Sequence, residues 1–166
     1  KTAAHDVGDI MKVYNGSFRD TWGFVPLSQS EADQLADDLL PFVDEHLIWI
    51  ATHDDQPVGT IMGFPDVNEM LRGLNGKLHP LNLIRIAARK GKVGSMRIAA
   101  LGVLPDYRNM GIETLMIRRV HDRVLERPYA RSEFSVVMEN NQRMRNLLMS
   151  AGFKECRKYR IYGKEL

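Results

Sequence analysis

The sequence contains one cysteine, Cys156, so the chain cannot form a disulfide within itself. No apolar run reaches membrane-spanning length, and the first residues lack the pattern of a signal peptide. The formal net charge is +2, which is too small to indicate nucleic-acid binding. One unpaired cysteine fits a reducing compartment. We therefore expect a cytoplasmic protein with no nucleic-acid or membrane partner.

The sequence also lacks metal-binding patterns and repeats. Its five histidines fall on separate predicted elements, and none has a partner at a spacing such as His-x-x-x-His, so we predict no metal site. A chain of 166 residues with 44% hydrophobic and 27% charged residues normally forms one globular domain with a substantial core. We therefore predict a single domain over residues 1–166.

Hydrophobic periodicity predicts alternating helices and strands. Helices are predicted over residues 7–18, 28–41, 65–76, 111–127 and 140–151. Strands are predicted over residues 47–52, 57–64, 93–104, 131–139 and 154–164. Ser28 and Glu31 have the spacing of a capping box at the start of the second helix, and the polar turn at 53–56 predicts a hairpin. Residues 77–92 fit either a flexible substrate loop or a surface linker.

The most informative segment connects the strand at 93–104 to the next helix. Pro105 and Asp106 mark a turn, and Arg108-x-x-Gly111 leads into the helix. A glycine at this position lets the backbone curl so that its N–H groups point inward. These N–H groups and the positive end of the helix dipole then face one point, which predicts an anion site. The alternative is an ordinary strand-to-helix connection.

This connection resembles the pyrophosphate loop of the GNAT superfamily of N-acyltransferases, whose pattern is Arg or Gln, two residues, Gly, one residue, then Gly or Ala. The strand end Leu101-Gly102-Val103 resembles the bulged end of the family's fourth strand. Further on, Asn141-x-x-Met144-x-x-Leu147-Leu148-x-x-x-Gly152-Phe153 resembles the family's last helix and its closing Gly-Phe pair. The chain also resembles a bacterial subgroup in which this domain is often the second half of a longer chain.

The resemblance implies an α/β (α+β) fold. Its mixed, mostly antiparallel sheet is splayed between the fourth and fifth strands, here 93–104 and 131–139, with helices on both faces. Acetyl-CoA is the implied acyl donor, a small-molecule amine or amino-acid-like compound is the implied acceptor, and a homodimer is expected. The backbone N–H of Val103 is implied to polarise the thioester carbonyl. The implied cofactor-binding residues are Leu101, Gly102, Val103, Arg108, Asn109, Met110, Gly111, Ile112 and Asn141.

Two residues depart from the family's pattern. Glu113 stands at the loop's last position, where its carboxylate would repel a phosphate unless it bends outward to solvent. We hypothesise that Glu113→Ala tightens acetyl-CoA binding; unchanged affinity would mean that Glu113 does not face the phosphates. Leu148 stands where the family commonly has a tyrosine that protonates the leaving thiolate. Both departures favour an alternative function, a catalytically inactive module that binds CoA, a metabolite or a partner domain.

Carboxylates of the predicted strand 131–139 are candidates for a general base. Glu133, Ser135, Val137 and Glu139 alternate onto one face, which suggests a wet cleft on that side. Glu139 comes at the strand end, where it could accept the amine's proton directly or through a water; a role in capping the next helix is equally open. Glu133 is interpreted as structural and paired with Arg97 on the neighbouring strand.

The loop after the first helix is the expected acceptor pocket, because this loop lines that pocket in the family. Asp20 could hold a cationic amine, and Trp22 could stack on it. Phe24 completes the predicted substrate-binding set. The alternative is that Trp22 and Phe24 only pack the loop onto the core.

Overall fold

A computed structural model describes residues 3–39, 43–72, 89, 92–126 and 129–164. The chain divides into two compact units, Lys1–Ser135 and Val136–Leu166, which are described separately below. The segment 77–92, which fits either a substrate loop or a linker, lies outside the described residues apart from Arg89 and Lys92. Among the described helices, none is long and apolar enough to cross a membrane.

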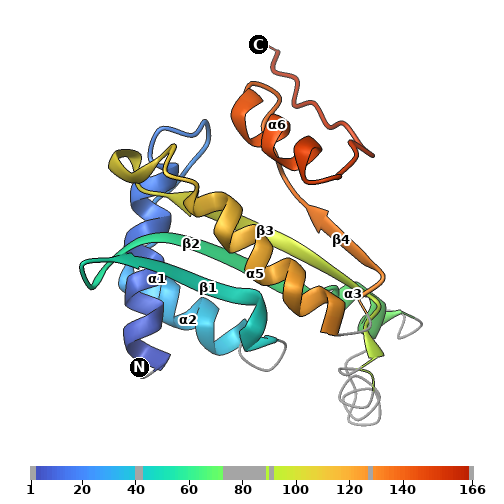
Figure 1. The fold of residues 1–166 in the computed structure, drawn as a ribbon, viewed down its shortest axis with the longest axis horizontal. Helices are drawn as coiled ribbons and strands as arrows, with labels where there is room; N and C mark the ends of the chain where they lie inside the picture. The colour runs from blue at the N-terminus through green and yellow to red at the C-terminus, as the bar shows by residue number, and fades with distance from the viewer. Residues whose placement is uncertain (1–2, 40–42, 73–88, 90–91, 127–128, 165–166) are drawn as a thin grey trace. The chain divides into compact units, whose positions relative to one another are not determined.

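The elements follow the predicted order closely (Figure 1). The helices are α1 (Ala3–Phe18), α2 (Gln29–Leu39), α3 (Val67–Leu71), α5 (Ile112–Glu126) and α6 (Gln142–Ser150), with the 3-10 turns η2 (Glu45–Leu47) and η4 (Pro105–Tyr107). The strands are β1 (Ile48–His53), β2 (Gln56–Pro65), β3 (Ser95–Val103) and β4 (Arg131–Phe134). The predicted capping box is confirmed, because the Glu31 carboxylate accepts from Ser28 N at 2.8 Å while Ser28 Oγ accepts from Glu31 N at 3.3 Å.

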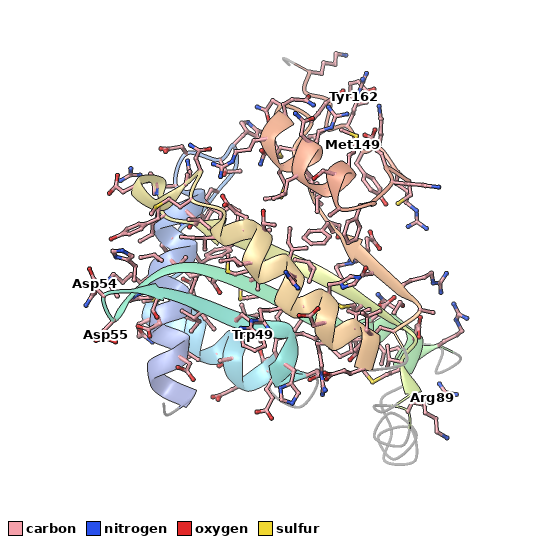
Figure 2. The ribbon with its side chains drawn as sticks, viewed as in Figure 1. Trp49, Asp54, Asp55, Arg89, Met149 and Tyr162 are labelled. Carbon is pink, nitrogen blue, oxygen red and sulfur yellow. The ribbon has the colours of Figure 1, made fainter. Side chains whose placement is uncertain are left out.

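The four strands form one mixed sheet in the order β1-β2-β3-β4. The pairs β1–β2 and β2–β3 are antiparallel, and β3–β4 is parallel. The predicted hairpin is confirmed, and Figure 2 shows Asp54 and Asp55 at its turn. Both residues have positive φ, 48° and 59°, which is the geometry that joins antiparallel strands through two residues.

Helices cover both faces of this sheet, as the resemblance implied (Figure 1). A Cβ added at Gly102 of β3 would meet Ser17 of α1, so α1 packs on one face. A Cβ added at Gly59 of β2 would meet Ile112 and Met116 of α5 on the other. Because Gly59 pairs with Val103, the residue after Gly102, the two helices lie on opposite sides of the same strand end. The core of this unit lies between these layers.

A bulge in β3 lies at the point where the sheet opens. Met62 pairs with Ala100 and Gly63 pairs with Ile98, so Ala99 is the extra residue. The expectation of a bulge at residues 101–103 is therefore wrong; these residues continue a regular ladder with β2. The pairing of β3 with β4 ends at Ile98 and Phe134, whereas β3 continues to Val103. The sheet is thus splayed between these strands, as predicted.

The strand predicted over 131–139 is shorter than expected. It ends at Phe134 rather than at Glu139, because its partner β3 bulges immediately after Ile98 and the parallel ladder cannot continue. The predicted pair on these strands is confirmed: Arg97 and Glu133 are opposite each other, with Nη2 and Oε2 3.3 Å apart. Their side chains are 47% and 40% exposed, so this is a surface pair of modest energy.

The second unit contains α6 and the C-terminal segment. Asn141 caps α6 by accepting from Met144 N at 3.1 Å. Gly152 follows the C-cap Ala151, and its φ of 89° suits a glycine that closes a helix. The predicted strand over 154–164 is wrong, since these residues form neither helix nor strand. Alternating side chains favour an extended backbone, but a strand also needs a ladder partner, which local sequence does not specify.

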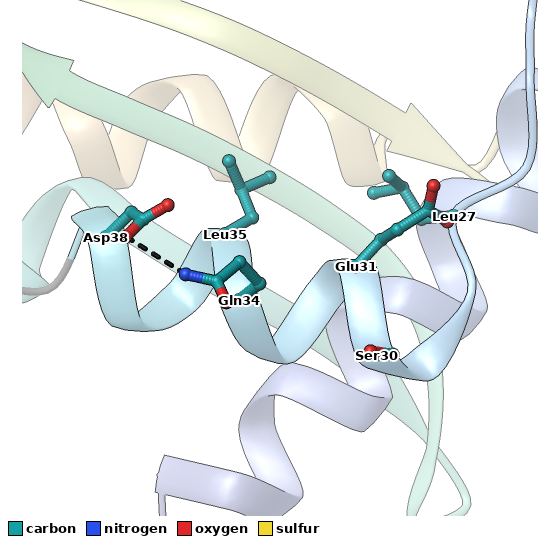
Figure 3. A pocket seen from close by; sticks show the side chains of 6 residues that line it. All are labelled: Leu27, Ser30, Glu31, Gln34, Leu35 and Asp38. Carbon is teal, nitrogen blue, oxygen red and sulfur yellow. Dashed lines mark hydrogen bonds between the residues drawn. The ribbon is translucent and has the colours of Figure 1, made fainter.

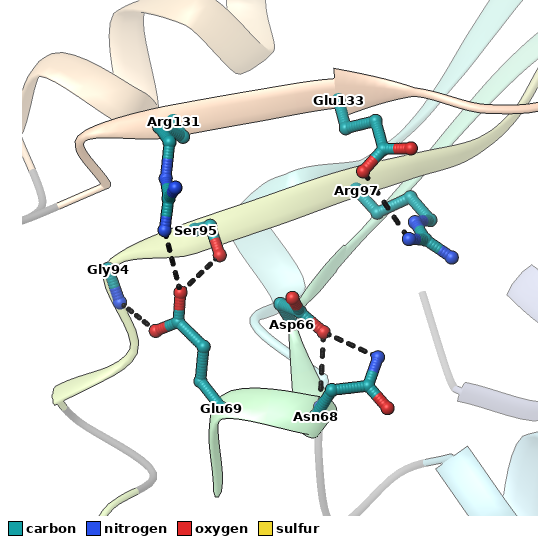
Figure 4. A network of polar contacts seen from close by, with 8 residues as sticks. All are labelled: Asp66, Asn68, Glu69, Gly94, Ser95, Arg97, Arg131 and Glu133. Atoms are coloured by element: carbon teal, nitrogen blue, oxygen red, sulfur yellow. Dashed lines mark hydrogen bonds and ion pairs between the residues drawn. The ribbon is translucent and has the colours of Figure 1, made fainter. Parts of the chain in front are cut away.

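Glu69 joins α3 to the start of β3 (Figure 4). Its carboxylate accepts from the Ser95 hydroxyl and from Gly94 N at 2.8 Å, and Arg131 Nη2 lies 3.8 Å from it. The Ser95 hydrogen bond, followed by the Gly94 hydrogen bond, holds the pKa of Glu69 below its ordinary value of 4.5. The ionised carboxylate therefore stabilises the fold above that value.

We expect Glu69→Gln to lower the free energy of unfolding by about 1–2 kcal/mol at neutral pH, because two hydrogen bonds to a charged acceptor are weakened. A group with a lowered folded-state pKa contributes its stability fully above the unfolded-state value and loses it as the pH falls through the lowered value. The difference between the two proteins should therefore shrink below about pH 4.5. Urea unfolding at several pH values measures it, with the exposed Asp37→Asn as the control; a pH-independent difference would contradict this account.

Candidate functional site

At the end of β3, some backbone groups point away from β2. Leu104 N donates to Val58 O at 2.9 Å, so the Val103 carbonyl in the same peptide unit points the opposite way. Along an antiparallel strand, residues whose backbone groups bond to the neighbouring strand alternate with residues whose backbone groups face away from it. Leu104 bonds to β2, so the N–H groups of Val103 and Leu101 face away from β2. They point toward the open side of the sheet, beyond the last β4 pair. This is the edge at which Val103 was predicted to polarise a carbonyl.

The loop from β3 to α5 is strongly curved. Asn109 and Gly111 have φ values of 68° and 80°, both in the left-handed region. The first hydrogen bond of α5 is made by Leu115 N to Gly111 O at 3.1 Å, which leaves the N–H groups of the first turn outside the helix ladder. Asn109, Met110 and Gly111 are exposed. This backbone fits an anion such as a pyrophosphate, which N–H groups and the helix dipole would hold.

The Arg108 side chain has other partners within the fold. Its Nε donates to Val103 O at 3.2 Å, and its Nη2 donates to Ser17 O at 2.9 Å. The guanidinium is part-buried and binds two backbone carbonyls, one at the end of β3 and one in the last turn of α1. The sequence gives no signal for Ser17, because it lies 91 positions away from Arg108.

Glu113 does not bend outward to solvent, which corrects that alternative. It is 8% exposed and lies on the buried face of α5 together with Met116 and Val120. These three residues are spaced by three and four positions, which places them on one helical face. The carboxylate at the start of α5 is therefore directed into the fold.

The three predicted acceptor residues have different environments. Trp22 is 71% exposed, and Asp20 is also exposed, with its carboxylate 3.7 Å from the neighbouring Arg19. Phe24 packs instead on Tyr14 at a ring-centroid distance of 5.5 Å, which supports a structural role for this residue. Asp20 and Trp22 are therefore the members of the set that a ligand could contact.

A hydrogen-bonded clamp that the sequence analysis missed fixes the end of this loop. Asn15 of α1 donates from Nδ2 to Leu27 O at 2.8 Å and accepts from Leu27 N at 3.0 Å. An asparagine in a helix carries no signal for such a distant backbone partner.

Glu139 and Asn141 belong to the second unit. The Glu139 carboxylate lies 3.8 Å from Arg160 Nη2, and its backbone carbonyl accepts from Arg145 Nη1 at 3.3 Å. Asn141 rather than Glu139 provides the side-chain cap of α6. The roles of Glu139 as a base and of Asn141 as a cofactor ligand stay predictions.

A shallow pocket of about 450 Å³ lies along α2 (Figure 3). Its lining combines apolar and acidic or amide side chains: Leu27, Ser30, Glu31, Gln34, Leu35 and Asp38. None of these belongs to the predicted cofactor loop or to the predicted acceptor set. Among the described residues, no group of three His, Cys, Asp or Glu side chains is placed to hold a metal ion.

Comparison with known proteins gives a family match over most of the chain. The sequence profile of the "Acetyltransferase (GNAT) family" matches residues 8–153. A protein described as a bacterial ceramide synthase, from Caulobacter vibrioides, is 31% identical over 168 aligned residues, covering 97% of this chain and 44% of the relative. The chain thus spans less than half the length of this curated relative.

Solved acetyltransferases have a similar fold. The aminoglycoside 6'-N-acetyltransferase AAC(6')-IG from Acinetobacter haemolyticus is 17% identical with a TM-score of 0.62, covering 99% of this chain and 96% of that one. Diaminobutyrate acetyltransferase EctA from Paenibacillus lautus, in complex with L-2,4-diaminobutyric acid and coenzyme A, is 18% identical with a TM-score of 0.57, covering 89% and 69%. At these identities the likeness shows the fold.

We expect Gly102→Ala to destabilise the protein by about 1–3 kcal/mol, because the new methyl group would overpack the contact between β3 and α1. The added Cβ would lie 2.8 Å from Ser17 Cβ and 3.0 Å from the Phe18 ring. Gly8→Ala is the matched control: no atom lies within 4 Å of its added Cβ, and alanine in a helix is favoured by about 0.5–1 kcal/mol. Urea denaturation measures both. Equal stability of Gly102→Ala and the parent would show that α1 is not packed closely against β3 at Gly102.

Proposed function

Because the chain belongs to the GNAT acetyltransferase family, we propose that it is an acyl-CoA-dependent N-acyltransferase that moves an acetyl group from acetyl-CoA to a primary amine. One observation carries the proposal. The strand edge at Val103 is followed closely in the chain by the left-handed loop at Asn109 and Gly111, and both direct backbone N–H groups away from the β2 and α5 ladders, where a carbonyl and an anion would accept from them. This is the pair of contacts that an acyl-CoA requires at its two polar parts.

The loop would hold the pyrophosphate through backbone N–H groups of residues 109–112. Charge-assisted hydrogen bonds to phosphate are strong, and the α5 dipole adds a favourable field at its N-terminus. The inward direction of Glu113 supports this role, since its carboxylate lies on the buried face of α5 rather than in the exposed turn. An acyl-CoA supplies an activated thioester to this site.

The Val103 N–H would polarise the thioester carbonyl. A fixed donor that points at the oxygen stabilises the negative charge that grows there as the amine attacks. The amine nitrogen forms a bond to the carbonyl carbon, the carbon–sulfur bond breaks, and the products are an amide and the free CoA thiol. Glu139 would accept a proton from the amine, and the thiolate gains one; because Leu148 cannot supply it, we assign that proton to solvent.

The acceptor would bind at the loop after α1. Asp20 and Trp22 are both exposed there, and together they suit a cationic ammonium group, through charge and through the aromatic face. Phe24 and the Asn15 clamp would keep the loop in place.

A second candidate uses a longer acyl chain and a lipid-like amine. The relative described as a ceramide synthase favours it, since a ceramide is an amide of a long-chain amino alcohol and a fatty acid. The reaction class is the same amide formation, so the two candidates differ in the chain length of acyl donor and amine. Comparing acetyl-CoA with a long-chain acyl-CoA, each with a short and a long-chain amine, separates them.

The test is amine-dependent release of the CoA thiol, followed with a thiol reagent. We expect turnover by the parent protein, and Gly111→Val should raise the KM for acetyl-CoA about tenfold or more, because a β-branched residue at a φ of 80° distorts the phosphate loop. Gly152→Val is the control, since Gly152 has a similar φ of 89° outside that loop, has no atom within 4 Å of an added Cβ, and should leave this KM unchanged. Binding of acetyl-CoA without turnover on any amine would support the non-catalytic module instead.

A further inference from the structure

Arg108 connects two segments that are distant in the chain. Its Nε donates to Val103 O at 3.2 Å and its Nη2 donates to Ser17 O at 2.9 Å. Both acceptors are backbone carbonyls, so the contacts fix main-chain positions rather than side-chain positions. The planar guanidinium holds its donors in a rigid fork, and a lysine could not reproduce this two-point contact.

Ser17 O is a carbonyl that needs an external partner. It belongs to the last four residues of α1, whose carbonyls have no acceptor role within the helix. The last turn of α1 contains no basic residue, although a positive charge is favoured there. Arg108, in the connection after β3, supplies both the donor and the charge.

The end of α1 and the end of β3 are closely packed where Arg108 connects them. Gly102 has no Cβ, and an added one would lie 2.9 Å from Ser17 Oγ. The Ser17 hydroxyl is itself buried and has no hydrogen-bond partner among the described residues. The backbone of β3 and the end of α1 therefore meet directly, with Arg108 bridging them at the next residue, Val103.

We propose that Arg108 is a positioning residue that fixes the Val103 edge and the beginning of the acceptor loop to each other. The loop with Asp20 and Trp22 begins immediately after α1, where Thr21 N donates to Phe18 O at 2.8 Å. Arg108 would thus align the carbonyl-polarising edge with the amine-binding loop through the protein's own backbone. This inference rests on the proposed acyltransferase function for its catalytic consequence, and it assigns Arg108 a role other than a phosphate ligand.

The experiment compares Arg108→Met with Arg118→Met, a control that removes an exposed arginine from α5. The first measurement is binding of two probes, CoA and pantetheine, which lacks the phosphates. We expect Arg108→Met to leave the ratio of the two affinities unchanged. A selective loss of CoA affinity with pantetheine affinity retained would overturn the proposal and make Arg108 a phosphate ligand.

The second measurement is steady-state turnover. Misplacement of reacting groups by about 1 Å costs up to about 100-fold in rate, so we expect a fall in kcat with the KM for acetyl-CoA unchanged. A residue that only stabilises the fold would lower Tm and leave the kcat of the folded protein alone. Arg108→Lys should recover part of the lost kcat, because one donor can still reach one carbonyl.

Hydrogen exchange tests the bridge without any ligand. We expect the Thr21 amide, next to the bridged end of α1, to exchange faster in Arg108→Met than in Arg118→Met. If the parent protein neither binds CoA nor turns over, the proposed function fails, while this exchange result still decides whether Arg108 holds the two segments. Unchanged exchange, or unchanged kcat in an active enzyme, would overturn the proposal.

Discussion

The central constraint in this fold is the loss of a ladder partner at the end of β3. Pairing with β4 stops at Ile98, the bulge at Ala99 redirects the strand, and β3 continues to Val103 with β2 as its partner among the described strands. Backbone N–H and C=O groups are costly to leave unpaired when they are removed from water. The open edge therefore needs partners, and a ligand carbonyl and the Arg108 guanidinium are the ones that we assign to it.

Neither charged side chain near this edge is directed at the exposed loop. The positive charge of Arg108 is directed to two main-chain carbonyls, and the negative charge of Glu113 is directed into the buried face of α5. Recognition of a pyrophosphate would then depend on N–H groups and the helix dipole rather than on opposing side chains. Close packing of α1 on Gly102 connects this edge to the loop that follows α1, so donor and acceptor binding, as we propose them, would both depend on this contact.

Local signals in the sequence predicted local structure well. The Ser28–Glu31 capping box and the hairpin turn each depend on residues a few positions apart. The Arg97–Glu133 pair was also predicted, because an arginine on an otherwise buried strand needs a partner of opposite charge. The early end of β4 and the absence of a strand at 154–164 were not predicted. Both depend on whether a neighbouring strand is available for pairing, which local sequence does not specify. The partners of Arg108 and Asn15 are long-range backbone atoms, for which single residues give no signal.

The most direct test of the central claim is thermal unfolding with and without saturating acetyl-CoA. A ligand that binds only the folded state, present at about 100 times its Kd, adds about 2.7 kcal/mol to the free energy of unfolding. At this chain length that corresponds to a rise in Tm of several degrees. The account predicts such a rise, with a smaller one for pantetheine, which lacks the phosphates. An unchanged Tm at millimolar acetyl-CoA would contradict an acyl-CoA site at the end of β3.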